Sequence, residues 1–189
     1  MLFAIIHVPK TAGTLLRHSI QYAYPQNELC LSAYHLRIDE FKKHKHDHTF
    51  VSMVRDPIQR KISQYHMRER NSHSIGILTT EDVEDYLFTN WGPMSNAYEF
   101  YYEGTSPKEM DFIGNADELD MTKSLFYNMF GININTSNKP NSNPYKESER
   151  YEVEVPTERF MEAFPKEYEL YYEGVDKFYS LCKEYKVSK

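Results

Sequence analysis

An apolar run near the start of the chain passes through a lysine-containing turn into a helical pattern, in the segment 5–16, IIHVPKTAGTLL. The run 2–8 predicts a strand, and the spacing after Gly13 predicts a helix over 14–23. Such a turn presents backbone N–H groups and the positive end of the helix dipole to an anion, and Lys10 adds a full positive charge. The segment therefore predicts an α/β fold with an oxyanion site at a strand end. It differs from the GxxxxGK loop of the common nucleotide hydrolases, because the lysine precedes the small residues and no glycine opens the turn.

A second segment repeats this order of a strand followed directly by a helix. The run 48–54 is rich in β-branched and aromatic residues, which favours a strand. Asp56 suits an N-cap and Pro57 suits the first position of a helix. Arg55 then stands at the carboxyl end of the strand, and Ser63 lies about two turns into the helix, away from its apolar face. We expect Arg55 and Ser63 to reach one phosphate.

Together the two segments resemble the sulfotransferases that use 3′-phosphoadenosine 5′-phosphosulfate (PAPS), and they are most similar to the carbohydrate 2-O-sulfotransferase-like branch. The resemblance rests on PKTAGT at 9–14 and RDPIQRKISQY at 55–65, and shorter matches follow in the family's order along nearly the whole chain. It implies a three-layer, P-loop-like α/β fold with a central, mainly parallel sheet flanked by helices. It also implies transfer of a sulfuryl group from PAPS to a hydroxyl of an acceptor.

The resemblance implies a role for individual residues. The first loop corresponds to the one that holds the 5′-phosphosulfate, and Arg55 and Ser63 correspond to the residues that hold the 3′-phosphate. The implied cofactor-binding residues are Pro9, Lys10, Thr11, Ala12, Gly13, Thr14, Arg55, Ser63, Asn138 and Lys139.

Lys10 and His35 are the candidate catalytic residues. Lys10 is suited to the oxygen that bridges sulfur and the 5′-phosphate, where negative charge develops. His35 follows a predicted short strand at 28–33, and the resemblance also points to it as the base that takes the acceptor's proton. A neutral imidazole fits that role near neutral pH, although an ordinary strand-end histidine is the alternative. The reaction needs no metal, and we predict none.

Two positions depart from the family's usual Lys-Thr-Gly-Gly-Thr-Ser loop, since Ala12 replaces a glycine and Leu15 replaces a serine. The methyl group of Ala12 is tolerated if its φ is negative, because the loop uses backbone donors more than side chains. The missing hydroxyl at Leu15 weakens a cofactor contact without removing the site.

Composition and spacing indicate one domain over 1–189, with a variable acceptor-side region at about 72–110. In that region, Tyr98 to Tyr102 are candidates for stacking on an acceptor, although most tyrosines are expected to fill the core. Asp56 and Arg60 are spaced for an i, i+4 ion pair near a helix start, so Arg60 is expected to support the scaffold. The remaining pattern predicts helices at 57–70, 81–88, 96–102, 116–130, 156–164 and 167–185, and a strand at 111–113.

The net charge of −6 and the lack of a lysine- and arginine-rich block disfavour nucleic acid and heavily sulfated glycans as acceptors. We expect a carbohydrate or another small neutral alcohol instead. No apolar run is long enough for a membrane span, and no signal peptide is evident, so we expect a cytoplasmic protein. A trimmed Golgi-type catalytic domain is the alternative.

Two other functions remain open on the sequence. A phosphate-binding loop serves an ATP-dependent small-molecule kinase equally well, but Asp56, the nearest candidate for a magnesium ligand, is better explained as a helix cap. A non-catalytic nucleotide-binding module is the third possibility. Oligomeric state is not encoded in any motif that we recognise.

Overall fold

The computed structural model describes residues 2–24, 48–72, 85–89, 95–136 and 157–188. A three-stranded parallel sheet lies at the centre of these residues, in the order β1 (Leu2–Ile6), β2 (His48–Val54), β3 (Phe112–Asn115). Ile5 pairs with Val51, which in turn pairs with Phe112. The carboxyl ends of parallel strands meet at one edge of the sheet, and both predicted phosphate-binding segments begin there.

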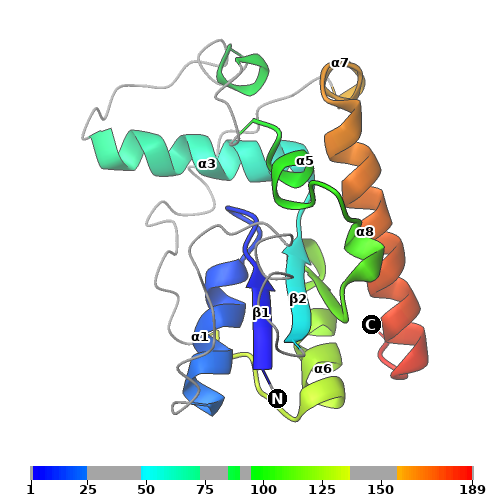
Figure 1. Cartoon of the computed structure of the whole chain (residues 1–189). Helices are drawn as coiled ribbons and strands as arrows, with labels where there is room; N and C mark the ends of the chain where they lie inside the picture. The colour runs from blue at the N-terminus through cyan, green and yellow to red at the C-terminus, as the bar shows by residue number, and fades with distance from the viewer. Residues whose placement is uncertain (1, 25–47, 73–84, 90–94, 137–156, 189) are drawn as a thin grey trace.

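Helices flank the sheet and cross this edge (Figure 1). The helix that follows β2 runs across the carboxyl edge, the first helix packs beside β1, and the long last helix lies along the side of the sheet nearer β3. The α-helices are α1 (Gly13–Ala23), α3 (Pro57–Ser72), α5 (Ala97–Tyr101), α6 (Leu119–Phe130), α7 (Thr157–Ala163) and α8 (Pro165–Glu184), and two short 3-10 helices are η2 (Pro107–Glu109) and η3 (Ala116–Glu118).

These elements confirm an α/β fold with a small parallel sheet flanked by helices. β2 has the predicted bounds, and the predicted helices at 57–70, 96–102 and 116–130 correspond to α3, α5, and η3 with α6. The predicted strand at 28–33 lies outside the described residues. The three-layer, P-loop-like arrangement stays a prediction.

Two apolar clusters hold the helices in place. The larger one surrounds the sheet and includes the rings of Phe3, Phe112, Phe126 and Phe130, which contact one another with centroid distances of 4.8 to 6.3 Å. The smaller cluster joins α3 to α7 and α8 around the buried ring of Phe160. Each fully buried aromatic side chain contributes about 1.5 to 3 kcal/mol to folding.

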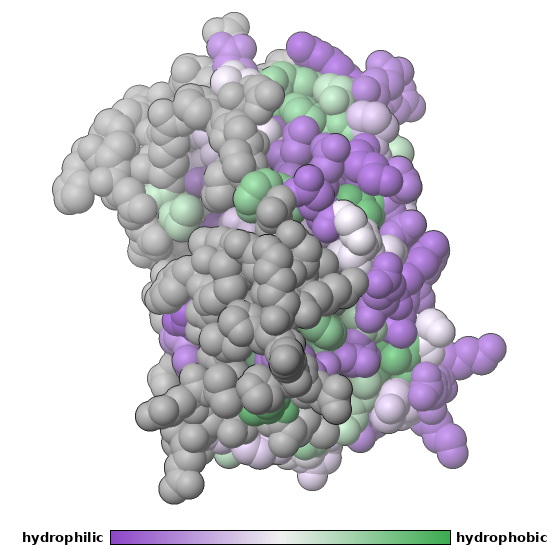
Figure 2. Space-filling model, in the orientation of Figure 1, coloured by the Kyte–Doolittle hydropathy of each residue, from purple (hydrophilic) through white to green (hydrophobic). Residues whose placement is uncertain are grey.

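A glycine brings α8 close to the carboxyl edge of the sheet. A Cβ atom at Gly174 would lie 2.6 Å from Cγ1 of Val54, the last residue of β2, so only glycine allows this approach. The outer face of α8 is hydrophilic (Figure 2). In the part of the chain that the structure describes, no helix combines the length and the apolar character that crossing a membrane requires.

Candidate functional site

The loop between β1 and α1 has an unusual backbone. Lys10 and Ala12 have positive φ angles, of 68° and 65°. The Thr11 hydroxyl, which is buried, donates a hydrogen bond to the Val8 carbonyl at 2.8 Å, and the Leu15 N–H donates to the Ala12 carbonyl at 2.9 Å. These bonds fix a tight turn directly before Gly13, the first residue of α1. The N–H groups of the first two residues, Gly13 and Thr14, have no carbonyl one turn before them within the helix, so these are the potential anion donors of the turn.

Ala12 does not meet the condition of a negative φ, because this residue is in the left-handed region. That conformation costs a non-glycine residue about 1 to 2 kcal/mol. The glycine of the loop serves another purpose: a Cβ atom at Gly13 would lie 2.3 Å from Cδ2 of His7. Gly13 therefore makes room for the His7 ring, while Ala12 adopts the conformation that glycine would adopt without strain.

Replacing Ala12 with glycine is expected to raise the free energy of unfolding by about 0.5 to 1 kcal/mol. Glycine removes the strain of the left-handed conformation, which stabilises the folded state. It also gives the unfolded chain more conformational entropy, which offsets part of that gain. Chemical denaturation of the parent and of Ala12→Gly measures the difference. Ala23→Gly, at the exposed helical end of α1, is the matched control and is expected to lower stability. A lower stability of Ala12→Gly would contradict the strain assigned to this position.

The second segment has the predicted helix start. Oδ1 of Asp56 accepts a hydrogen bond from the Gln59 N–H at 2.9 Å, which makes Asp56 the N-cap, and Pro57 is the first residue of α3. Oδ2 of Asp56 accepts from the Tyr168 hydroxyl at 3.3 Å. Burial raises the pKa of the Asp56 carboxyl, and these hydrogen bonds partly oppose the shift. Both oxygens therefore serve the protein's own structure.

The structure brings the two predicted segments together. Nη1 of Arg55, half-buried at the end of β2, lies 3.4 Å from the Lys10 carbonyl oxygen. Nζ of Lys10 lies 3.8 Å from Sδ of Met67 in α3. Met67 is one helical turn beyond Ser63, so both project from the same face of α3. The Lys10 ammonium group and Ser63 thus lie on one side of α3, next to the carboxyl ends of β1 and β2.

The acid Asp117, which the sequence analysis missed, completes this edge. It is the second residue beyond β3, whereas Arg55 is the first residue beyond β2, and its Oδ1 lies 3.9 Å from Nε of Arg55. Its Oδ2 accepts a hydrogen bond from the Asp56 N–H at 3.0 Å. A signal was present in the sequence, because polar residues just beyond neighbouring parallel strands meet at one edge of the sheet.

The expected ion pair between Arg60 and Asp56 is wrong. Arg60 is fully buried, and its Nη2 lies 3.2 Å from Oε2 of Glu167 in α8, which is also buried. Next to it, Nζ of buried Lys61 donates to the Leu87 carbonyl at 2.6 Å and lies 3.7 Å from the centroid of the Phe164 ring. Burial lowers the pKa of the Lys61 ammonium group to about 7, and the Arg60 charge adds to this effect. Arg60 does support the scaffold, but through the core.

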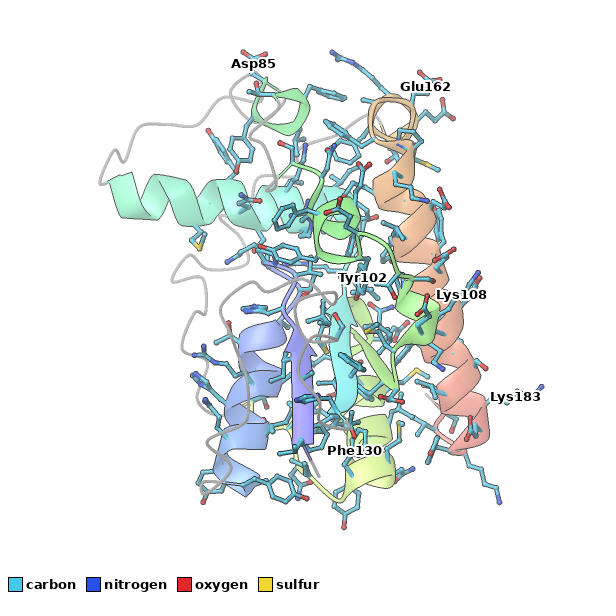
Figure 3. All side chains as sticks on the ribbon, in the orientation of Figure 1. Asp85, Tyr102, Lys108, Phe130, Glu162 and Lys183 are labelled. Carbon is cyan, nitrogen blue, oxygen red and sulfur yellow. The ribbon has the colours of Figure 1, made fainter. Side chains whose placement is uncertain are left out.

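The prediction that tyrosines between positions 98 and 102 stack on an acceptor is wrong. Tyr98, Tyr101 and Tyr102 are at most 3 % exposed. Tyr102, labelled in Figure 3, lies between α5 and β2, where its hydroxyl donates to Oγ of Ser52 at 2.7 Å. The tyrosines of α5 and of the residue after it therefore belong to the core and not to an acceptor surface.

Three of the predicted site residues lie outside the described residues: His35, Asn138 and Lys139. Over residues 2–24, 48–72, 85–89, 95–136 and 157–188, no three His, Cys, Asp or Glu side chains are gathered as a metal ion would require. Comparison with protein-family models, curated proteins and solved structures found no match.

Proposed function

We propose that this protein is a sulfotransferase that moves a sulfuryl group from PAPS to a hydroxyl of a carbohydrate or another small neutral alcohol. The observation that carries the proposal is the contact of the Arg55 guanidinium group with the Lys10 carbonyl oxygen, at 3.4 Å. PAPS has two anionic ends on one nucleoside, so a site for it needs two groups of donors that lie close together. The proposed fold is the three-layer, P-loop-like arrangement of the PAPS-dependent enzymes.

The proposed binding residues divide between the two anionic ends. The loop from Pro9 to Thr14 holds the 5′-phosphosulfate with its N–H groups and with Lys10. Arg55 and Ser63 hold the 3′-phosphate, for which a planar guanidinium group is a suitable partner. Asn138 and Lys139 lie near the cofactor in this proposal.

In the proposed reaction, the acceptor oxygen forms a bond to sulfur while the bond between sulfur and the bridging oxygen breaks. The leaving group, adenosine 3′,5′-bisphosphate, keeps the electron pair, and Lys10 stabilises the charge that develops on its 5′-phosphate. The proton of the acceptor hydroxyl goes to the imidazole of His35. A loose transition state of this kind is stabilised mainly by positioning and electrostatics, and it requires no covalent intermediate on the protein.

The kinase alternative is less well supported, because both Asp56 oxygens accept hydrogen bonds within the protein. A magnesium-dependent kinase needs a carboxylate that is available to the metal. The net charge of −6 agrees with a neutral acceptor better than with a polyanion.

Saturating adenosine 3′,5′-bisphosphate is expected to raise the melting temperature without any metal, while ATP with Mg²⁺ is not. At about 100 times the dissociation constant, binding stabilises the folded state by about 2.7 kcal/mol, which corresponds to roughly 5 to 10 °C for a chain of this size. Thermal unfolding with each ligand measures the two shifts.

An equal shift with both ligands, or a larger shift with ATP and Mg²⁺, would support the kinase and contradict the proposal. If PAPS binds but no hydroxyl acceptor in a panel of neutral sugars and alcohols receives sulfate, the chain is a nucleotide-binding module instead.

A further inference from the structure

One buried hydroxyl holds the main chain of Arg55 on both sides. The Tyr98 hydroxyl donates a hydrogen bond to the Arg55 carbonyl oxygen at 2.6 Å and accepts one from the Arg55 N–H at 2.7 Å. Arg55 is the first residue beyond β2, where the pairing with β3 ends. The tyrosine therefore replaces the neighbouring strand as the partner of this residue, across 43 positions of sequence.

The Tyr98 ring is itself fixed from several directions. It is fully buried, stacks on Tyr102 with a centroid distance of 6.2 Å, and lies 5.8 Å from the Arg60 guanidinium carbon. Glu167, the partner of Arg60, also accepts a hydrogen bond from the Glu99 N–H in α5 at 3.0 Å. Burial raises the pKa of the Tyr98 hydroxyl well above its ordinary value, so it keeps its proton and can donate at physiological pH.

Two contacts of the Arg55 side chain are longer than the hydrogen bonds that its main chain makes with Tyr98. The contacts with the Lys10 carbonyl and with Asp117 are 3.4 and 3.9 Å long, against 2.6 and 2.7 Å for the two hydrogen bonds with Tyr98. The side chain starts from this main chain, so the two hydrogen bonds with Tyr98 set the position from which the guanidinium group leaves the sheet edge. Bidentate binding of a phosphate by an arginine depends on the direction of the guanidinium group.

We propose that Tyr98 is a positioning residue that sets Arg55 for binding the 3′-phosphate of the donor, an inference that rests on the proposed function. Because Tyr98 is fully buried, it is not expected to touch the ligand itself. It acts through the Arg55 main chain, and Tyr102 beside it has no such connection, because its hydroxyl bonds to Ser52 within the sheet.

The test compares two ligands that differ only in the 3′-phosphate. Affinities for adenosine 3′,5′-bisphosphate and adenosine 5′-phosphate are measured by titration calorimetry in the parent, in Tyr98→Phe and in Tyr102→Phe. Tyr98→Phe is expected to lower the affinity for the bisphosphate about tenfold and the affinity for the monophosphate less than twofold. Tyr102→Phe, which also loses one buried hydroxyl in the same short segment, is expected to leave the ratio of the two affinities as it is in the parent.

The ratio is insensitive to partial unfolding, because both ligands bind the same folded molecules. If Tyr98→Phe is unfolded at 25 °C, the ratio is measured at 10 °C. A parent that prefers the bisphosphate, together with an unchanged preference in Tyr98→Phe, overturns the positioning role alone. A parent that does not distinguish the two ligands overturns the proposed function and this inference with it.

Discussion

Replacing Lys10 with alanine is expected to lower the turnover of sulfuryl transfer by about two orders of magnitude or more. Lys10 sits in the turn before α1, and its ammonium group extends toward Met67 on the Ser63 face of α3. In the proposed reaction this charge lies where the leaving 5′-phosphate gains negative charge. Its loss removes an interaction that grows in the transition state, so kcat falls more than the affinity for PAPS.

The measurement is the rate at which adenosine 3′,5′-bisphosphate appears, with the best acceptor of the parent enzyme. Lys108→Ala is the matched control, because it removes one positive charge from a lysine of η2 whose side chain is 57 % exposed and pairs with Glu173 of α8. It is expected to retain parental activity. A Lys10→Ala variant with activity within a few-fold of the parent would contradict the catalytic role.

Replacing Glu167 with alanine is expected to lower the free energy of unfolding by about 3 to 5 kcal/mol. The side chains of Arg60 and Glu167 are 0 % and 1 % exposed, so the change leaves a buried guanidinium charge without its partner. It also removes the acceptor of the Glu99 N–H. A buried charge or donor without a partner destabilises the folded state by its full desolvation free energy. The loss of this one carboxylate therefore lowers stability strongly.

Urea denaturation of the parent and of Glu167→Ala measures this loss. Glu169→Ala is the control from the same helix, because Glu169 also accepts from a lysine, Lys166, but both side chains are about half exposed. It is expected to leave the midpoint unchanged, since water screens an exposed pair. A midpoint for Glu167→Ala as high as that of Glu169→Ala would show that the buried pair does not support the fold.

The partners of Arg60 and Asp56 show where sequence-based prediction reaches its limit. Their spacing predicts that they pair with each other, yet Arg60 pairs with Glu167, 107 positions away, and Asp56 caps α3. Helical spacing reports neighbours on the same helix only. Once α8 packs over α3, a carboxylate that is buried with the arginine becomes its better partner, because each satisfies the other's charge out of water.

The sequence alone determined the elements whose signals are local. The apolar strands, the Asp56 cap with Pro57 behind it, and the lysine turn before α1 depend on neighbours within a few residues, so their pattern is sufficient. The left-handed φ of Ala12 was missed, because an alanine gives no sign of that conformation. Only the tertiary structure decided which side chains meet. Arg55 reaches Lys10, and Tyr98 holds Arg55, because β1, β2 and α5 pack together across more than 40 positions of sequence, which no local pattern encodes.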